Sequence, residues 1–200
     1  MKRSFLFVAA VILLLVVAYA GRMVHRGFST RSAPSAVEST LAMTLRDMAI
    51  PTRYKTMKNP VAVTPEVIHE GMAHWADHCA TCHANNGSGD TMYGRTMYPR
   101  PPDIRKKDTQ EMSDGELYYT IQNGIRLSGM PAFGGPGDND LDSWKLVAFI
   151  RYLPLLSQSE QREMETMNPK SPQEIEEERE EENFLEGSPA PSPPQPNHHH

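Results

Sequence analysis

The sequence predicts an all-α protein in which a small helical bundle follows an apolar N-terminal helix and precedes a disordered C-terminal tail. Three observations support this expectation. An unbroken apolar run occupies residues 5–20. Helical apolar spacing, interrupted by loops rich in Gly and Pro, extends over residues 64–156. Residues 157–200 carry 11 acidic but only 3 basic side chains and include a proline-rich string.

The composition limits the classes of protein to which the chain can belong. It has 200 residues, a formal net charge of −5 and 38% hydrophobic residues. These totals allow one ordinary domain with extensions and argue against a polytopic membrane protein. Non-specific binding to nucleic acid needs a surplus of Lys and Arg, so we expect no nucleic-acid partner. The 2 cysteines lie three positions apart and cannot form the disulfide framework of a small secreted domain.

The first 21 residues have two interpretations. Their apolar run follows Lys2 and Arg3 and would be about 24 Å long as a helix, slightly short of a bilayer core. It is therefore either an uncleaved membrane anchor or a signal peptide that is cut after the small-x-small triplet at 18–20. Arginines on both sides of the run leave its orientation undecided by the positive-inside rule.

The segments on either side of the bundle lack sustained periodicity. We expect residues 22–63 to form mainly a tether, in which a short helix at 40–49 is the one regular element that the pattern allows. Residues 157–200 are predicted to be disordered, because acidic and proline-rich segments bury too little apolar surface to offset chain entropy. This tail is interpreted as a solvated extension, with docking to a partner as the alternative. His198–His200 are native residues or the remnant of a tag and carry no argument about a site.

Local signals mark three helices of the bundle, which is expected to span residues 64–156. The first begins near Thr64, because a polar residue followed by proline is a typical helix start. A middle helix is expected from Asp114 to a glycine at 124, a residue preferred after helix C-termini. The last helix starts after the acidic stretch 138–140, whose negative charge suits a helix N-terminus.

The most informative residues are Cys79, Cys82 and His83, which form a C-x-x-C-H motif. This is the attachment motif of c-type haem: the two thiols reach the two vinyl groups of one porphyrin, and the imidazole that follows reaches the iron. A thioredoxin-like redox pair would need a βαβ pattern, which the sequence lacks. A structural zinc site would need four ligands, and there is no second cysteine pair. We therefore predict one covalently bound haem c, with His83 as an iron ligand.

The other iron ligand is predicted to be Met130. It lies 47 residues after His83, in the stretch S-G-M-P-A-F-G-G at 128–135. Gly and Pro force a non-helical loop there, which can bring a thioether close to a flat ring. Met92 and Met97 are the alternatives, in a loop nearer to His83. A thioether ligand favours reduced iron and raises the reduction potential.

With these residues, the stretch from about 64 to 156 resembles the class I c-type cytochromes. Gly71, Trp75 and Cys79 match the G-x-x-x-aromatic-x-x-x-C pattern of that family's first helix, and residues 144–153 look like its closing helix. The resemblance implies a small all-α bundle around one haem, in which the first and last helices cross. A glycine suits such a crossing because it lets two helices approach closely.

The loop Tyr98–Asp103 resembles the proline-containing loop of the same family, whose backbone carbonyl orients the proximal histidine. Pro101 and Pro102 both qualify for that role. Arg95 and Arg100 are candidates for pairing with haem propionates, with a solvated surface position as the alternative for each. Three histidines of the first helix are interpreted as exposed positions rather than as metal ligands: His69, His74 and His78.

An iron held by both His83 and Met130 has no vacant position for a substrate, so we expect electron transfer rather than catalysis. The predicted function is a one-electron carrier of a respiratory chain, not an enzyme. One alternative is an integral cytochrome subunit of a respiratory or dehydrogenase complex. Another is a haem enzyme or ligand sensor in which Met130 is absent from the iron.

The expected partners are redox proteins outside the cytoplasm. A quinol-oxidising complex or a dehydrogenase would be the donor, and a terminal oxidase the acceptor. In bacteria of this family, haem attachment requires export, so we expect the haem domain in the periplasm. It would be anchored to the inner membrane by residues 1–21, or soluble if that segment is cleaved. Residues 64–156 contain 8 basic and 12 acidic side chains, which suits a partner with a basic docking patch.

Overall fold

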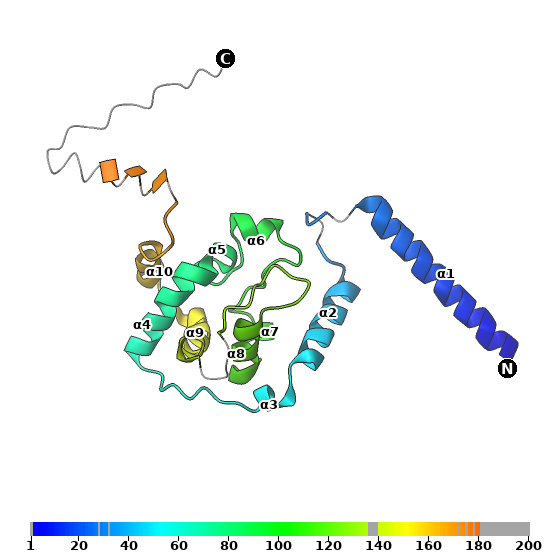
Figure 1. Cartoon of the computed structure of the whole chain (residues 1–200), viewed down its shortest axis with the longest axis horizontal. Helices are drawn as coiled ribbons and strands as arrows, with labels where there is room; N and C mark the ends of the chain where they lie inside the picture. Colours follow the sequence, from blue (N-terminus) through cyan, green and yellow to red (C-terminus); the bar gives the residue numbers. More distant parts are fainter. Residues whose placement is uncertain are drawn as a thin grey trace, which may run out of the picture.

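The fold was analysed in a computed structural model, which describes residues 2–27, 29–31, 33–135, 140–171, 173–174, 176–177 and 179–180. Every named element of this part of the chain is a helix, which confirms the predicted all-α class (Figure 1). The elements are α1 (Lys2–Arg26), α2 (Ala36–Ala49), α3 (Thr52–Lys55), α4 (Pro65–His74), a π-helical turn (Trp75–Cys79), α5 (Ala80–His83), α6 (Met92–Thr96), α7 (Lys107–Gln110), α8 (Asp114–Asn123), α9 (Leu141–Tyr152), a 3-10 turn (Leu153–Leu155) and α10 (Gln158–Glu165).

Helix α1 extends away from the helical domain (Figure 1). Residues 3–25 are long and apolar enough to cross a membrane, and none of them is buried in the fold. A membrane anchor and a signal sequence both have these properties. The two interpretations of this segment therefore both stand.

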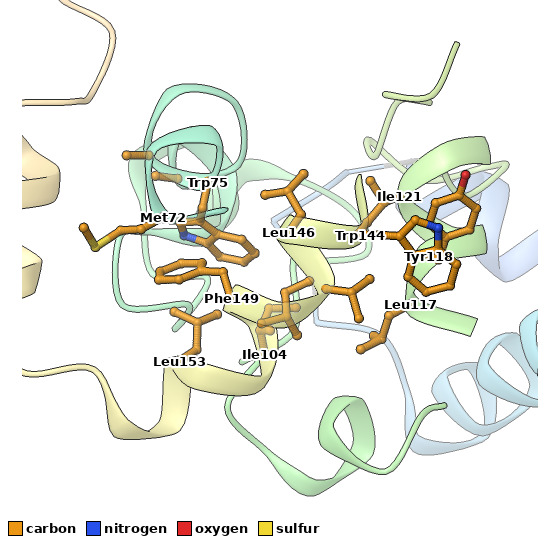
Figure 2. Close-up of a cluster of buried hydrophobic side chains, with 14 of the residues drawn as sticks. Met72, Trp75, Ile104, Leu117, Tyr118, Ile121, Trp144, Leu146, Phe149 and Leu153 are labelled. Carbon is orange, nitrogen blue, oxygen red and sulfur yellow. The ribbon is translucent and has the colours of Figure 1, made fainter. Parts of the chain in front are cut away.

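The core is centred on the crossing of α4 and α9 at Gly71. A Cβ atom at this position would lie 2.4 Å from the carbonyl oxygen of Lys145 and 2.9 Å from the Cβ of Phe149. Only glycine allows the two helices to come this close. Trp75 packs on Phe149 beside the crossing, with ring centroids 5.9 Å apart (Figure 2).

Helix α8 completes the core on the other side of α9. Tyr118 of α8 stacks on Trp144 of α9 with ring centroids 4.0 Å apart, and both rings are almost fully buried (Figure 2). Leu117 and Ile121 extend this contact toward Leu146. Stacked and tilted aromatic pairs of this kind stabilise a core beyond the area that they bury.

The helix boundaries that local chemistry predicts are confirmed. Thr64 caps α4 by accepting a hydrogen bond from the backbone of Val67, and a proline follows at the first helical position. Gly124, with φ of +64°, ends α8. Asp140 caps α9 by accepting bonds from the backbone N–H groups two and three residues further on.

The packed domain begins before residue 64, within the segment expected to be a tether. Helix α2 occupies part of it, and Ile50 and Tyr54, which follow α2, are 3% and 4% exposed. The Tyr54 ring packs on Tyr119 of α8 at 4.8 Å. Helix α2 itself buries none of its residues, so the two residues after it provide the anchoring.

The packed domain also extends beyond residue 156, into the segment expected to be disordered. Ser157 and Glu160 form a capping box that starts α10. Met164 is fully buried in the core, and the Tyr152 hydroxyl donates a hydrogen bond to Glu160 at 2.7 Å. A capping box and one buried methionine are therefore enough to order α10, although the acidic composition of the segment favours disorder. Residues 181–200, with the proline-rich string and His198–His200, lie outside the described residues.

Candidate functional site

The first helix changes its pitch where the C-x-x-C-H motif begins. Helix α4 passes into a π-helical turn at Trp75 and then into α5, which ends at His83. Ala84 stops the helix with a positive φ of 63°, and its carbonyl accepts a hydrogen bond from the indole Nε1 of Trp75 at 3.0 Å. Single π-helical turns within α-helices are frequent at functional sites. The π-helical turn and the indole hydrogen bond together fix the position at which the helix ends, directly after His83.

One cavity brings together the residues that the sequence predicts as haem ligands and attachment sites. Cys79, Cys82, His83 and Met130 all line it. The space between its walls, open mouth included, is about 1090 Å³. Much of the wall is apolar and includes Trp75, Ile104, Leu117, Ile121, Ile125, Leu146 and Ile150. The space therefore suits a large, flat and mainly apolar group.

His83 is held in the form that binds a metal. Burial lowers the pKa of His83 to about 4, while the nearby backbone carbonyl of Pro102 has the opposite, smaller effect. The imidazole is therefore neutral at neutral pH, with a nitrogen lone pair available. Its Nδ1 atom is buried without a hydrogen-bond partner of normal geometry. Of the two prolines considered, Pro102 is the one whose backbone carbonyl interacts with the His83 ring.

The cysteines do not have the character of a thiol redox pair. Burial raises the pKa of Cys79 to about 12, and the neighbouring Cys82 adds to this effect. Both cysteines are free thiols in this structure. Redox-active C-x-x-C motifs depend on a lowered thiol pKa, so this environment argues against that chemistry. Two thiols at the wall of a largely apolar cavity fit covalent attachment of haem.

The loop that carries Met130 folds back on the end of α8. The Met130 carbonyl accepts a hydrogen bond from the backbone of Ile125 at 3.2 Å. The Ser128 hydroxyl donates to the Ile125 carbonyl at 2.7 Å and accepts from the Met130 N–H at 3.1 Å. At Gly124 a Cβ would lie 2.6–2.8 Å from backbone atoms of residues 130–132. A tight, hydrogen-bonded loop thus positions Met130 at the cavity wall.

Met97 is the remaining alternative to Met130. Met92 is 73% exposed and does not line the cavity. Met97 does line it, and its methyl group packs on Gly129, where a Cβ would lie only 1.9 Å away. The two candidate thioethers therefore come from different loops that touch at this glycine.

Three arginines lie near the site, in different environments. Arg95 forms a two-pronged, exposed ion pair with Asp90 at 2.5 and 2.9 Å and does not line the cavity. Arg100 lines the cavity and remains the candidate for a haem propionate. Arg46 also lines it, from α2. Arg46 is not predicted as a site residue because it lies in the segment interpreted as a tether and no motif marks it.

The three histidines of the first helix are half-exposed, as expected, and each faces a carboxylate. His69 pairs with Glu163 at 3.3 Å, and His74 with Asp142 at 3.7 Å. His78 pairs with Asp77 at 3.3 Å and also lines the cavity, where its ring stacks on Phe133. Within the described part of the chain, no group of three metal-binding side chains is formed by His, Cys, Asp and Glu.

Comparison with known proteins places this site within a known family model. Residues 66–150 match the model described as Cytochrome C oxidase, cbb3-type, subunit III. The matched range runs from the start of α4 almost to the end of α9 and contains all four predicted site residues. No curated protein shows a significant match to the chain.

Proposed function

We propose that the chain, whose residues 66–150 form a c-type cytochrome domain, is a one-electron carrier with a single covalently bound haem. The observation that carries this proposal is the shared cavity. Two cysteines, a neutral buried imidazole and a methionine line one largely apolar space. The haem iron, when bound, supplies reversible one-electron oxidation and reduction.

The residues of the site have separate roles in this proposal. Cys79 and Cys82 would each hold the porphyrin through a thioether, and His83 and Met130 would be the ligands of its iron. The wall is largely apolar, which would limit the access of water to the bound group. Because the same two ligands suit both oxidation states, the protein rearranges little when an electron enters or leaves.

We place the haem domain on the periplasmic side of the bacterial inner membrane. Helix α1 supports anchoring in a membrane because it is exposed along its length and long enough to span one. The periplasmic side is proposed from the chemistry of haem attachment, which requires export in bacteria of this family. In this setting, the donor is a quinol-oxidising complex or a dehydrogenase, and the acceptor is a terminal oxidase. The acidic balance of residues 64–156 suits partners with a basic docking patch.

A second candidate function is that of an integral subunit of a respiratory complex, and two observations favour it. The matched family model is that of an oxidase subunit. In addition, α2 presents four apolar side chains at helical spacing to solvent, with 55–78% of each exposed: Val37, Leu41, Leu45 and Met48. Such a stripe is typical of a helix that docks on another protein.

The first experiment is to produce the full chain in a bacterium that attaches c-type haem. We expect the intact mass to increase by one haem and the reduced pyridine haemochrome spectrum to be that of haem c. Replacing both cysteines, as in C79S with C82S, should abolish attachment. A colourless protein with two free thiols would refute the proposal.

The same protein sample also shows whether the N-terminal segment is cleaved and whether the chain is part of a larger assembly. The measured mass of the intact chain decides whether residues 1–20 are removed. Extraction in a mild detergent separates the two candidate functions, since a carrier should migrate as a monomer and a subunit as part of a larger assembly.

A further inference from the structure

The returning arm of the Met130 loop is tied to the last turn of α8. The N–H of Phe133 donates to the carbonyl of Ile121 at 3.0 Å, and the N–H of Gly134 donates to the carbonyl of Gln122 at 3.2 Å. Carbonyls at the C-terminal end of a helix have no partner within the helix, so the loop satisfies them. The main chain beyond Met130 is therefore held against α8.

The side chain of Gln122 links the same point to the start of α9. Its amide Nε2 donates to the Asp140 Oδ2 and to the Ser143 hydroxyl, both at 2.7 Å. The Ser143 hydroxyl in turn donates to Asp140 Oδ2 at 2.9 Å. Gln122 and Ser143 are only 9% and 3% exposed. A buried polar network of this kind is expensive to disrupt, because each group loses a partner that water cannot replace.

The path of the loop depends on how this amide is oriented. A Cβ at Gly134 would lie 1.9 Å from Gln122 Oε1 and 2.3 Å from its Cδ, so the loop backbone runs directly over the amide. Because Nε2 is held by Asp140 and Ser143, Oε1 is turned toward the loop. A displaced amide would push the backbone only four residues after Met130.

The charge of Asp140 strengthens this arrangement. Partial burial by itself raises its pKa, but hydrogen bonds from Ser143 and Gln122 outweigh burial and hold the pKa of Asp140 below its usual value. The group is therefore an anion at neutral pH. Hydrogen bonds to a charged group are about twice as strong as those between neutral groups.

From these contacts we infer that Gln122, Asp140 and Ser143 are positioning residues that clamp the Met130 loop onto α8 and α9 and thereby hold Met130 at the iron. The inference rests on the proposed function, because the clamp acts through Met130. None of the three residues lines the cavity, so their effect on the iron passes through the loop.

The test compares two glutamine variants of the haem-loaded full chain. Q122L removes both side-chain bonds of the clamp. Q110L is the matched control: the Gln110 amide also donates two hydrogen bonds, at 2.9 Å to the carbonyls of Ile104 and Ile150, but it does not contact residues 125–135. Both variants should unfold at a lower denaturant concentration than the wild type, since each loses two hydrogen bonds.

Only the clamp variant should change the iron. Imidazole competes with the thioether for ferric iron, so a loosened Met130 loop exposes the position that imidazole takes. We expect Q122L to bind imidazole at least about tenfold more tightly than the wild type, the effect of one hydrogen bond to a charged group. It should also have a weaker red absorption band from the ferric iron–thioether bond and a lower reduction potential. Q110L should retain wild-type values for all three.

The S143A variant loses one donor and one acceptor of the network. Its imidazole affinity, red absorption band and reduction potential should lie between those of Q122L and the wild type. If Q122L keeps the wild-type imidazole affinity while its stability falls, the network is only structural and the inference is wrong. The wild type and M130A are measured first. If the wild type lacks the iron–thioether band, or if M130A retains it, Met130 is not the ligand, and the proposed ligation fails together with the clamp. Failure of the clamp alone leaves the wild-type band in place.

Discussion

The crossing of α4 and α9 predicts that G71A is severely destabilising, although it adds a single methyl group. The added carbon would lie 2.4 Å from the Lys145 carbonyl oxygen, and relief to an ordinary contact requires a shift of about 1 Å. Both neighbours belong to α9 and are held by the core, so the helices must separate. Separation by this distance forfeits a quarter to a half of the dispersion energy at the contact.

We expect G71A to lower the free energy of unfolding by about 2–3 kcal/mol, at the upper end of the usual range for an overpacked core. Urea unfolding of the haem-loaded chain, followed by Trp fluorescence and by haem absorption, measures this change. G135A is the matched control, because a Cβ at Gly135 would meet nothing within 4 Å. It should stay within about 0.5 kcal/mol of the wild type. If G71A also changes the free energy of unfolding by less than about 0.5 kcal/mol, with an unchanged slope against urea concentration, the two helices do not need the glycine.

Three further predictions concern the acid range, the C-terminal helix and α2. The pKa of Asp140 is lowered by folding, so its contribution to stability is present above its ordinary pKa of 3.8 and is lost as the pH falls below it. The D140N variant should therefore be less stable than the wild type at pH 7 and lose less unfolding free energy between pH 5 and 2. If urea titrations show the same pH dependence of stability for both proteins, this prediction is wrong. Met164 is fully buried, so M164A should cost about 2–4 kcal/mol. Its control M48A, at a position 74% exposed, should cost almost nothing, and equal effects in thermal unfolding would mean that α10 does not pack. L45D on the exposed stripe of α2 should leave the haem spectrum unchanged but release the chain from any larger assembly in native gels; retention would argue against α2 as a docking helix.

Features set by local chemistry could be predicted from the sequence. A polar residue before Pro65, a glycine at 124 and an aspartate at 140 mark helix ends because their effects involve only the next few residues. The C-x-x-C-H motif is equally local, since its spacing alone matches one porphyrin. These signals sufficed to outline the bundle and to name four residues that line its cavity: Cys79, Cys82, His83 and Met130.

Features that depend on one distant contact could not be predicted. Tyr54 and Met164 each dock a segment whose overall composition favours a tether or a disordered tail. The proximity of Pro102, rather than Pro101, to His83 depends on the backbone path of a loop. Gln122 carries no motif: a glutamine near the end of a helix is normally exposed, and only the position of the α9 cap gives its amide two side-chain partners.

The two predicted iron ligands are held in the fold by interactions of different strength. On the histidine side, the ligand ends a helix that is fixed by the Trp75 indole bond to Ala84, and two thioethers would attach the same segment to the porphyrin. On the methionine side, the loop of Met130 is held by hydrogen bonds to α8 and by the Gln122 network. Each such bond contributes only about 1 kcal/mol, and a covalent bond does not open at these energies. The Met130 side of the proposed site should therefore yield before the His83 side. We expect substitutions around α8 and α9 to change ligand exchange and potential, and substitutions around Trp75 to change the folding of the whole domain.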